Sequence, residues 1–263
     1  MRIIVQQLGD GVLGRWATTS RILAIAGTAC ALALRPSAWP VTTRDVLARQ
    51  VYFTAIEAVR SVSIIAAFVG IAIVVQAQVW LIKFGQTAYL GPLLVAVIVR
   101  ELGPLLTSFV VIGRSGTAVT AELATMRVNR EDRVLEAQGV DPFSYLVMPR
   151  VLGMMISVLC LTLVFIIVSF FSGYLFGILM GITEQDPLTF AESLMMHLTF
   201  ADVMNVLAKT LLSGALTGAI CCNEGLGVSG ATTEVPQAAG RALLRSVFAL
   251  FTTAFIISLV SYL

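Results

Sequence analysis

Three charged residues lie inside stretches of sequence that are otherwise apolar. Arg100 and Glu101 interrupt residues 84–113, and Lys209 interrupts residues 203–223. A charge at the centre of a membrane-spanning helix costs about 2.5–3.5 kcal/mol on insertion scales, so such residues usually face a partner, a cavity or water. These three residues are therefore the first candidates for a binding site.

The residues that follow the charged pair predict a kinked helix. Pro104 lacks the N–H that would bond the carbonyl of Arg100, and Gly103 lets a neighbouring segment approach closely. A kinked, charged helix centre suits a cavity wall better than a surface that faces lipid. We therefore expect Gly103 and Pro104 to shape the helix at a cavity.

Helix geometry places the two cations at similar depths. If their helices enter the membrane from the same side near residues 92 and 203, Arg100 lies about 12 Å deep and Lys209 about 9 Å deep. Together they would hold an anionic head group, with Glu101 balancing charge and apolar walls accepting acyl chains. In the competing interpretation, Arg100 pairs with an acid used in helix packing, and Lys209 extends to the outer interface.

The composition describes a membrane protein. Of 263 residues, 58% are hydrophobic and 12% are charged, whereas a soluble domain has about 25% charged residues. This excludes a disordered chain and argues against a water-soluble enzyme, and a net charge of +2 is too weak to indicate nucleic acid. Because about 20 apolar residues cross a bilayer, the charge-poor windows predict five spans, at about 59–82, 91–113, 146–176, 203–222 and 243–262.

The N-terminal region differs from these spans. Only 13 uncharged residues lie between Arg21 and Arg35, too few to cross a bilayer. Residues 1–40 are interpreted as a basic amphipathic helix in the interface, with a cleaved signal peptide as the alternative. The fold class is thus an all-α integral membrane protein of one domain. Residues 41–263 form its transmembrane bundle, with a cytoplasmic coupling loop at about 114–145.

Arginines are concentrated on one side of the predicted spans. Seven arginines lie before the first span or at its start, and the loop 114–150 carries five more, whereas the loop 181–202 on the other side has no Lys or Arg. By the positive-inside rule the N-terminus is cytoplasmic, and five spans place the C-terminus on the opposite side. The loop also alternates acidic and basic residues around a few apolar ones. This predicts a short docking helix, with a merely solvated loop as the alternative.

The chain lacks motifs for catalysis of its own. There is no Gly-Lys pair and hence no Walker A loop, and neither Gly-x-Ser-x-Gly nor HExxH occurs. Four cysteines without CxxC spacing and one histidine predict no metal site. Gly214 and Gly218 indicate close helix packing. We expect no catalytic residue here and no cofactor in this chain, so an ATPase that drives transport would be another protein.

An ordered series of motifs resembles the MlaE/YrbE permease family. The series covers about fifty residues and comprises Arg100-Glu101-Leu102-Gly103-Pro104, Gly113-Arg114-Ser115-Gly116, Thr120-Ala121-Glu122-Leu123, Met126-Arg127, Gly139-Val140-Asp141-Pro142 and Pro149-Arg150. The family's Ala-Thr-Thr segment departs from this agreement. It normally lies just before the last span, but Ala231-Thr232-Thr233 lies earlier here.

The resemblance implies the membrane subunit of an ABC transporter that moves phospholipids in the bacterial envelope. Such permeases form homodimers with two cytoplasmic ATPases, which bind ATP and Mg, and with a periplasmic hexamer of an MCE-domain protein. Some systems add a STAS-domain protein. The implied location is the bacterial inner membrane. A chloroplast envelope homologue is the alternative, which the lack of a transit-like extension disfavours.

The resemblance also implies residue roles. The pair Arg100–Glu101 would line the lipid cavity, and Lys209 matches a basic position of that cavity. The family's coupling helix maps roughly onto Thr125 to Val140. The coupling residues expected there are Arg127, Arg130, Glu131, Arg133, Glu136, Gly139 and Asp141.

Two other functions stay open from the sequence. One is a permease of the same architecture for another amphipathic substrate, such as a sterol or a toxic solvent. The other, from a different class, is an intramembrane enzyme or an ATP-independent scramblase. The direction of transport is not encoded in these residues, because head-group cations bind a lipid that arrives as well as one that leaves.

Overall fold

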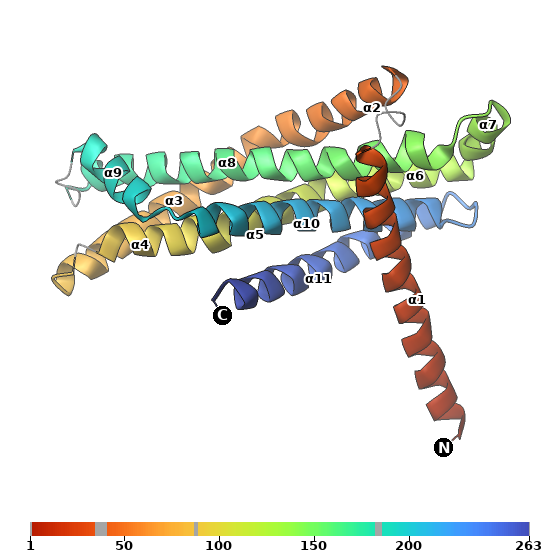
Figure 1. The fold of residues 1–263 in the computed structure, drawn as a ribbon, viewed down its shortest axis with the longest axis horizontal. Coiled ribbons are helices and arrows are strands. Elements are labelled where there is room, and N and C mark those ends of the chain that lie inside the picture. Colours follow the sequence, from red (N-terminus) through yellow and green to blue (C-terminus); the bar gives the residue numbers. More distant parts are fainter. Residues whose placement is uncertain (1, 35–40, 87–88, 182–185, 263) are drawn as a thin grey trace.

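The computed structural model describes residues 2–34, 41–86, 89–181 and 186–262, with only the backbone for 2–17, 41 and 262. All regular elements in these ranges are helical and most run along one long axis (Figure 1). The α-helices are α1 (Arg2–Ala33), α2 (Val41–Val51), α3 (Glu57–Lys83), α4 (Leu90–Leu94), α5 (Gly103–Val111), α6 (Thr117–Val128), α7 (Glu131–Ala137), α8 (Met148–Leu179), α9 (Pro187–His197), α10 (Phe200–Leu226) and α11 (Glu234–Tyr262). Four π-helical segments join them: η2 (Tyr52–Ile56), η4 (Val95–Leu102), η5 (Ile112–Gly116) and η6 (Phe143–Val147).

Among the described residues, five helices are long and apolar enough to cross a membrane, and the first three of them are composed of several consecutive elements. This confirms the predicted number. They comprise Thr42–Lys83, Leu90–Val128, Phe143–Leu179, Phe200–Leu226 and Glu234–Ser261. The third is one continuous helix, and Gly173 and Gly177 are buried along it. The bundle has two ends, which we call the α9 end and the α7 end (Figure 1).

The second span extends further than the sequence indicated. We expected a loop from residue 114, but η5 and α6 continue the helix to Val128. Val119, Leu123 and Ala124 are buried on one side of α6, which packs against α10 and α11. The polar residues of this stretch are therefore on a helix that projects beyond the apolar window, and the loop assignment was wrong for residues 114–128.

Small residues let the central helix α10 pack closely against α8. A Cβ added to Gly214 would lie 2.8 Å from the Cα of Met155, and one added to Gly218 would lie 2.7 Å from the Cα of Val151. Real Cβ atoms do not approach a backbone this closely. The close packing predicted from the Gly214–Gly218 spacing is confirmed.

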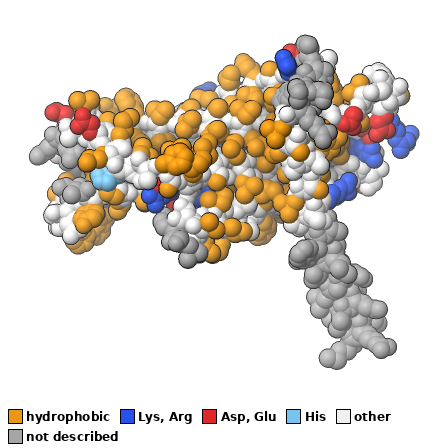
Figure 2. Space-filling view, viewed as in Figure 1, with side chains coloured by type: hydrophobic (Ala, Val, Ile, Leu, Met, Phe, Trp, Pro, Cys, Tyr) orange, Lys and Arg blue, Asp and Glu red, His pale blue; other side chains and the backbone are white. Residues whose placement is uncertain are grey.

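Hydrophobic side chains cover the long face in Figure 2, and most charged side chains of that view gather at the two ends. This distribution is that of a protein whose middle is surrounded by acyl chains. The described side chains of α1 include a shorter apolar segment, Thr18–Ala33. Ile22 and Ala29 of that segment are buried against α8 and α10. Residues 35–40 of the predicted N-terminal region lie outside the described ranges.

Candidate functional site

The three charged residues singled out in the sequence meet inside the bundle. The Nζ atom of Lys209 lies 2.9 Å from Oε1 of Glu101 and donates a hydrogen bond of 2.7 Å to the carbonyl of Arg100. The two cationic residues are therefore at the same level, as the depth arithmetic predicted. The Lys209 side chain is only 3% exposed, so the alternative in which it extends to the outer interface is wrong.

The backbone around Arg100 explains why its carbonyl accepts this bond. Pro104 has no N–H to offer the carbonyl four residues back. The preceding segment η4 is π-helical, with the N–H of Gly103 bonded to the carbonyl of Ile98. Such segments locally widen a helix and occur frequently at functional sites. The disruption predicted at Gly103 and Pro104 thus takes the form of a π-to-α transition.

Arg100 itself pairs with Asp202, an acid near the start of α10. The Asp202 side chain is 1% exposed and also accepts a 2.8 Å hydrogen bond from the N–H of Thr199, as part of a capping box. Asp202 therefore holds the beginning of α10 and the guanidinium together. The competing interpretation of the sequence, that Arg100 pairs with an acid used in helix packing, is correct in this respect.

Asn205 lies on the same face of α10, between Asp202 and Lys209. The spacing of three and seven residues places all three on one side of a helix. Asn205 is 5% exposed, and neither polar atom of its side chain has a hydrogen-bond partner among the described residues. A buried amide without a partner costs about 1–3 kcal/mol, so a ligand or water that satisfied it would bind favourably.

A third helix completes the arrangement. Ser258 of α11 donates a 2.9 Å hydrogen bond to Oε1 of Glu101. Pro104 and Lys209 line a small pocket together with Leu250, Thr253 and Ala254 of α11. We call Arg100, Glu101, Asp202, Asn205, Lys209 and Ser258 the polar cluster.

The polar cluster is charge-balanced and partly open. It holds two cations and two anions, and the side chains of Arg100 and Glu101 remain 27% and 36% exposed. Such a group of charged side chains within an apolar bundle can hydrogen-bond a charged head group.

The predicted coupling segment forms a helical hairpin at the α7 end. α6 ends at Val128, and Arg130 adopts the left-handed conformation (φ 59°) at the start of α7. An ion pair between Arg127 and Asp132 closes this turn. Gly139, at φ 78°, ends α7 in a conformation that favours glycine, and its N–H donates to the carbonyl of Glu136.

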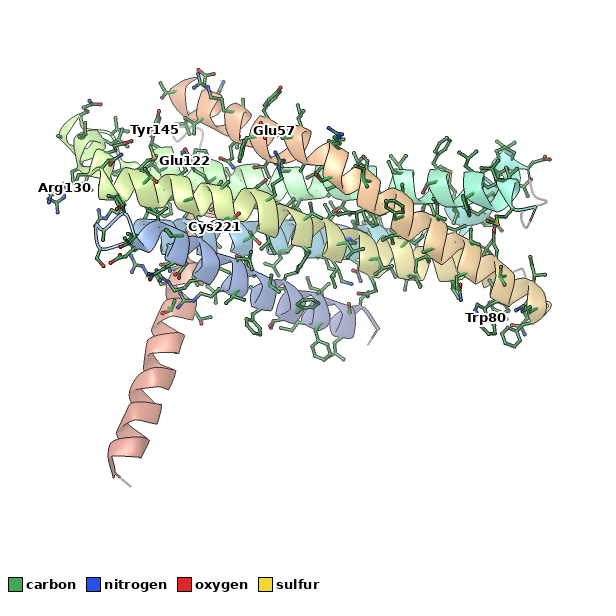
Figure 3. All side chains as sticks on the ribbon, turned by 180° about the vertical axis from the view of Figure 1, so that it is seen from behind. Glu57, Trp80, Glu122, Arg130, Tyr145 and Cys221 are labelled. Atoms are coloured by element: carbon green, nitrogen blue, oxygen red, sulfur yellow. The ribbon has the colours of Figure 1, made fainter. Side chains whose placement is uncertain are left out.

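Apart from the buried Asp132, the charged side chains of α7 are directed outward. Glu131, Arg133 and Glu136 are all exposed, and the label of Arg130 marks this end of the molecule in Figure 3. The short helix predicted from the charge pattern is present as α7. Its role in coupling stays a prediction.

Asp141 caps the next helix rather than standing free. It accepts hydrogen bonds from the hydroxyl of Ser144 at 2.6 Å and from the N–H groups of Ser144 and Phe143 at 3.1 and 3.2 Å. The hydroxyl bond is the largest influence, and with the backbone bonds it outweighs partial burial and lowers the pKa of Asp141 below its usual value of 3.8.

We expect Asp141→Ala to destabilise the protein by about 1 kcal/mol, because two N–H groups at the helix start lose their acceptor. Thermal unfolding in detergent at pH 7 should show a midpoint lower by about 2–4 °C.

A lowered pKa means that this stabilisation by Asp141 is present above the usual carboxyl pKa and is lost as the pH falls through the lowered value. The difference should therefore disappear in strong acid. Asp45→Ala, at an exposed position of α2, is the control, and an equal shift in both variants would contradict the capping role.

Other residues of the motif series connect helices at the α7 end. Glu122 of α6 accepts a 3.0 Å hydrogen bond from Nη2 of Arg150 in α8, and Arg114 pairs with Glu57 of α3. Figure 3 places Glu57 and Glu122 in this half of the bundle. These residues hold the composite helix Leu90–Val128 against its neighbours. A structural role therefore accounts for part of the motif series.

A comparison with known families decides the affiliation of this fold. The sequence model of the family described as permease MlaE matches residues 47–260. The match begins inside α2 and ends near the end of α11. The chain belongs to the MlaE permease family. The resemblance inferred from the motifs is thereby confirmed. An MlaE-family permease is the membrane subunit of an ABC transporter, and the five helices make this one a multi-pass membrane protein.

Relatives of this MlaE-family chain support the same assignment. A probable ABC transporter permease of Synechocystis is 33% identical over 199 residues, 74% of this chain and 73% of the relative. The chloroplastic protein TRIGALACTOSYLDIACYLGLYCEROL 1 of Arabidopsis thaliana is 30% identical over 194 residues, 73% and 55% of the two chains. The intermembrane phospholipid transport system permease MlaE of Haemophilus influenzae is 31% identical over 132 residues, 50% and 51% of the two chains.

Sequence reasoning missed three members of the polar cluster. Asp202 was expected in an outer loop, and neither Asn205 nor Ser258 was expected at the site. The spacing of Asp202 and Asn205 relative to Lys209 was the available signal, since it aligns three polar residues on one face of an apolar helix. The pairing with Ser258 had no counterpart in local sequence.

Proposed function

We propose that this permease moves phospholipids between membranes of the bacterial envelope, and that the lipid head group is held at the polar cluster in a cavity between two copies of the chain. The observation that carries the proposal is the buried contact of Lys209 with Glu101 and the Arg100 carbonyl in the apolar bundle. The name of the Haemophilus influenzae relative, an intermembrane phospholipid transport permease, agrees with it.

The geometry suits a phosphate-bearing head group. Arg100 is partly exposed while paired, so its guanidinium can donate further hydrogen bonds to a phosphate without losing Asp202. The unpartnered amide of Asn205 supplies a donor and an acceptor on the same face. Glu101 keeps Lys209 in place and offsets its charge. Leu250 and Ala254 beside Lys209 give apolar surface for an acyl chain.

One composite helix links this site to the coupling hairpin. Leu90–Val128 carries Arg100 and Glu101 near its first third and Arg127 at its far end, about 40 Å along the helix. Two π-helical segments, η4 and η5, interrupt it. Such segments are places where a helix bends. Movement of α7 by an ATPase would therefore be transmitted along this helix to the polar cluster.

The partners belong to the same proposal. A cytoplasmic ATPase dimer, which binds ATP and Mg, would dock on α7. A periplasmic MCE-domain hexamer would receive or deliver lipid at the α9 end, with a STAS-domain protein on the ATPase in some systems. The proposed location is the bacterial inner membrane with the α7 end in the cytoplasm, so that the N-terminus is cytoplasmic and the C-terminus periplasmic.

Reconstituted lipid transfer tests the proposal. The permease, its ATPase and its MCE partner are placed in liposomes, and transfer of a fluorescent phospholipid is followed with ATP and without it. The proposal predicts transfer that requires ATP. Equal transfer without ATP would indicate a scramblase and contradict it. Mass spectrometry of the lipids that copurify with the complex distinguishes the other alternative, since a sterol in place of phospholipid would contradict the substrate assignment.

A further inference from the structure

A second charged pocket lies near the α7 end, separate from the polar cluster. It is formed where α1, α10 and α11 come together, and is lined by Thr18, Arg21, Asn223, Glu224, Arg241 and Arg245 among others. No residue of the polar cluster contributes to it. We call it the basic pocket.

The charges of the basic pocket favour an anion. Three arginines and one glutamate give the lining a net charge of +2. The carboxylate of Glu224, only 6% exposed, accepts a 3.2 Å hydrogen bond from Nε of Arg241 and also pairs with Nη1 of Arg245. A guanidinium has five N–H donors, so these pairs fix the two arginines in position and leave most of their donors for a ligand.

The basic pocket lies at the level of lipid head groups. On α11, Arg245 is the last charged residue before Ser246–Tyr262, an uncharged run of 17 residues. This run is about 25 Å long, close to the thickness of the hydrocarbon core. Arg241 and Arg245 are therefore at the boundary where that core meets the polar interface.

An apolar stripe continues from the pocket toward the bilayer centre. Leu244, Phe248, Phe251 and Phe255 are all exposed on α11, and their spacing of four, three and four residues places them on one face. The same face continues to Arg241. A ligand with a phosphate in the pocket and hydrocarbon chains along these side chains would match both parts of the surface.

We propose that the basic pocket binds the phosphate of an anionic phospholipid in the leaflet at the α7 end, with the acyl chains against the apolar stripe of α11. Arginines recognise phosphate through paired N–H donors, and basic pockets between transmembrane helices bind phospholipid head groups in this way. A soluble phosphate compound would use only the polar half of the surface. This site is independent of the transport site at the polar cluster.

Photo-crosslinking with a phosphatidylglycerol that carries a diazirine in its acyl chain tests the proposal. The chain is reconstituted in bilayers, irradiated and digested with trypsin, which releases Ser246–Leu263 with Phe248, Phe251 and Phe255 of the stripe. It also releases Ser61–Lys83 from α3, which serves as an internal reference. We expect labelling of Ser246–Leu263 relative to the reference to fall about fivefold in Arg21→Gln, because each arginine near the head groups contributes about 1 kcal/mol. Arg44→Gln, the same change at an exposed position of α2, should leave it unaltered.

Competition on the wild-type chain tests the same claim without any variant. Unlabelled phosphatidylglycerol should reduce labelling, whereas diacylglycerol, which lacks the phosphate, should not. Excess glycerol 3-phosphate should also have no effect, and competition by it as strong as by the lipid would overturn the lipid assignment.

Unchanged labelling in Arg21→Gln, or equal competition by diacylglycerol, would also overturn the proposal. A Lys209→Gln variant separates this site from the transport site. Labelling of Ser246–Leu263 should persist in it, and its loss there would show that the label came from the polar cluster.

Discussion

Replacing Lys209 by methionine should reduce ATP-driven lipid transfer by more than tenfold and destabilise the protein by about 3 kcal/mol. The change leaves the carboxylate of Glu101 without its cation, and breaking a buried ion pair at one partner costs about 3–5 kcal/mol. We take the lower end because the side chain of Glu101 is 36% exposed. Transfer should fall further than stability explains, because the head group also loses a donor.

A second substitution separates stability from function. In Lys209→Met/Glu101→Gln no uncompensated charge remains, so thermal stability should recover most of its loss while transfer stays low. Lys83→Met is the matched control, because Lys83 is at the exposed end of α3, 5.3 Å from the ring centre of Trp80. That cation–π contact contributes about 0.5–1 kcal/mol. Wild-type transfer by the double variant would contradict a role of Lys209 in binding.

The second large effect concerns the contact of α10 with α8. Gly218→Ala should destabilise the protein by about 3 kcal/mol or more, since its Cβ would lie 2.7 Å from the Cα of Val151 and the two helices must separate. The identical change at Gly240 of α11 meets nothing within 4 Å. Because alanine is the better helix former, Gly240→Ala should stabilise by up to about 1 kcal/mol.

Thermal unfolding in detergent measures both changes. The midpoint should fall by roughly 6–12 °C for Gly218→Ala and stay level or rise slightly for Gly240→Ala. Since the two variants differ only in position, equal midpoints would show that α10 and α8 are not in the close contact described.

The number of spans could be predicted from the sequence because an apolar, nearly uncharged window of about twenty residues is long enough to cross a bilayer and rare in soluble proteins. The extent of the second span could not, because polarity suggested a loop from residue 114. The helix accommodates the charged residues Arg114 and Glu122 because they pair with Glu57 and Arg150 of other helices. Such pairings between distant residues are not visible in a local window.

The candidate site was predictable in part, because charged residues are conspicuous in an otherwise apolar window. Arg100, Glu101 and Lys209 could be singled out because a charge inside a membrane span is costly. The rise of 1.5 Å per helical residue then predicted similar depths for the two cations. Their partners could not be singled out, because Asp202 looked like a loop acid and Ser258 like an ordinary residue of an apolar span. The bond from Lys209 to the Arg100 carbonyl depends on Pro104 and on a π-helical segment, and only the missing N–H of Pro104 is written in the sequence.

A structure of the full-length chain in lipid nanodiscs, determined by electron cryo-microscopy, tests the central claim most directly. The account predicts two protomers around a cavity, with density for a phosphate head group within hydrogen-bond distance of Arg100, Asn205 or Lys209 and acyl-chain density along α11. An empty polar cluster, with its cations turned toward bulk bilayer and solid packing between the protomers, would contradict it.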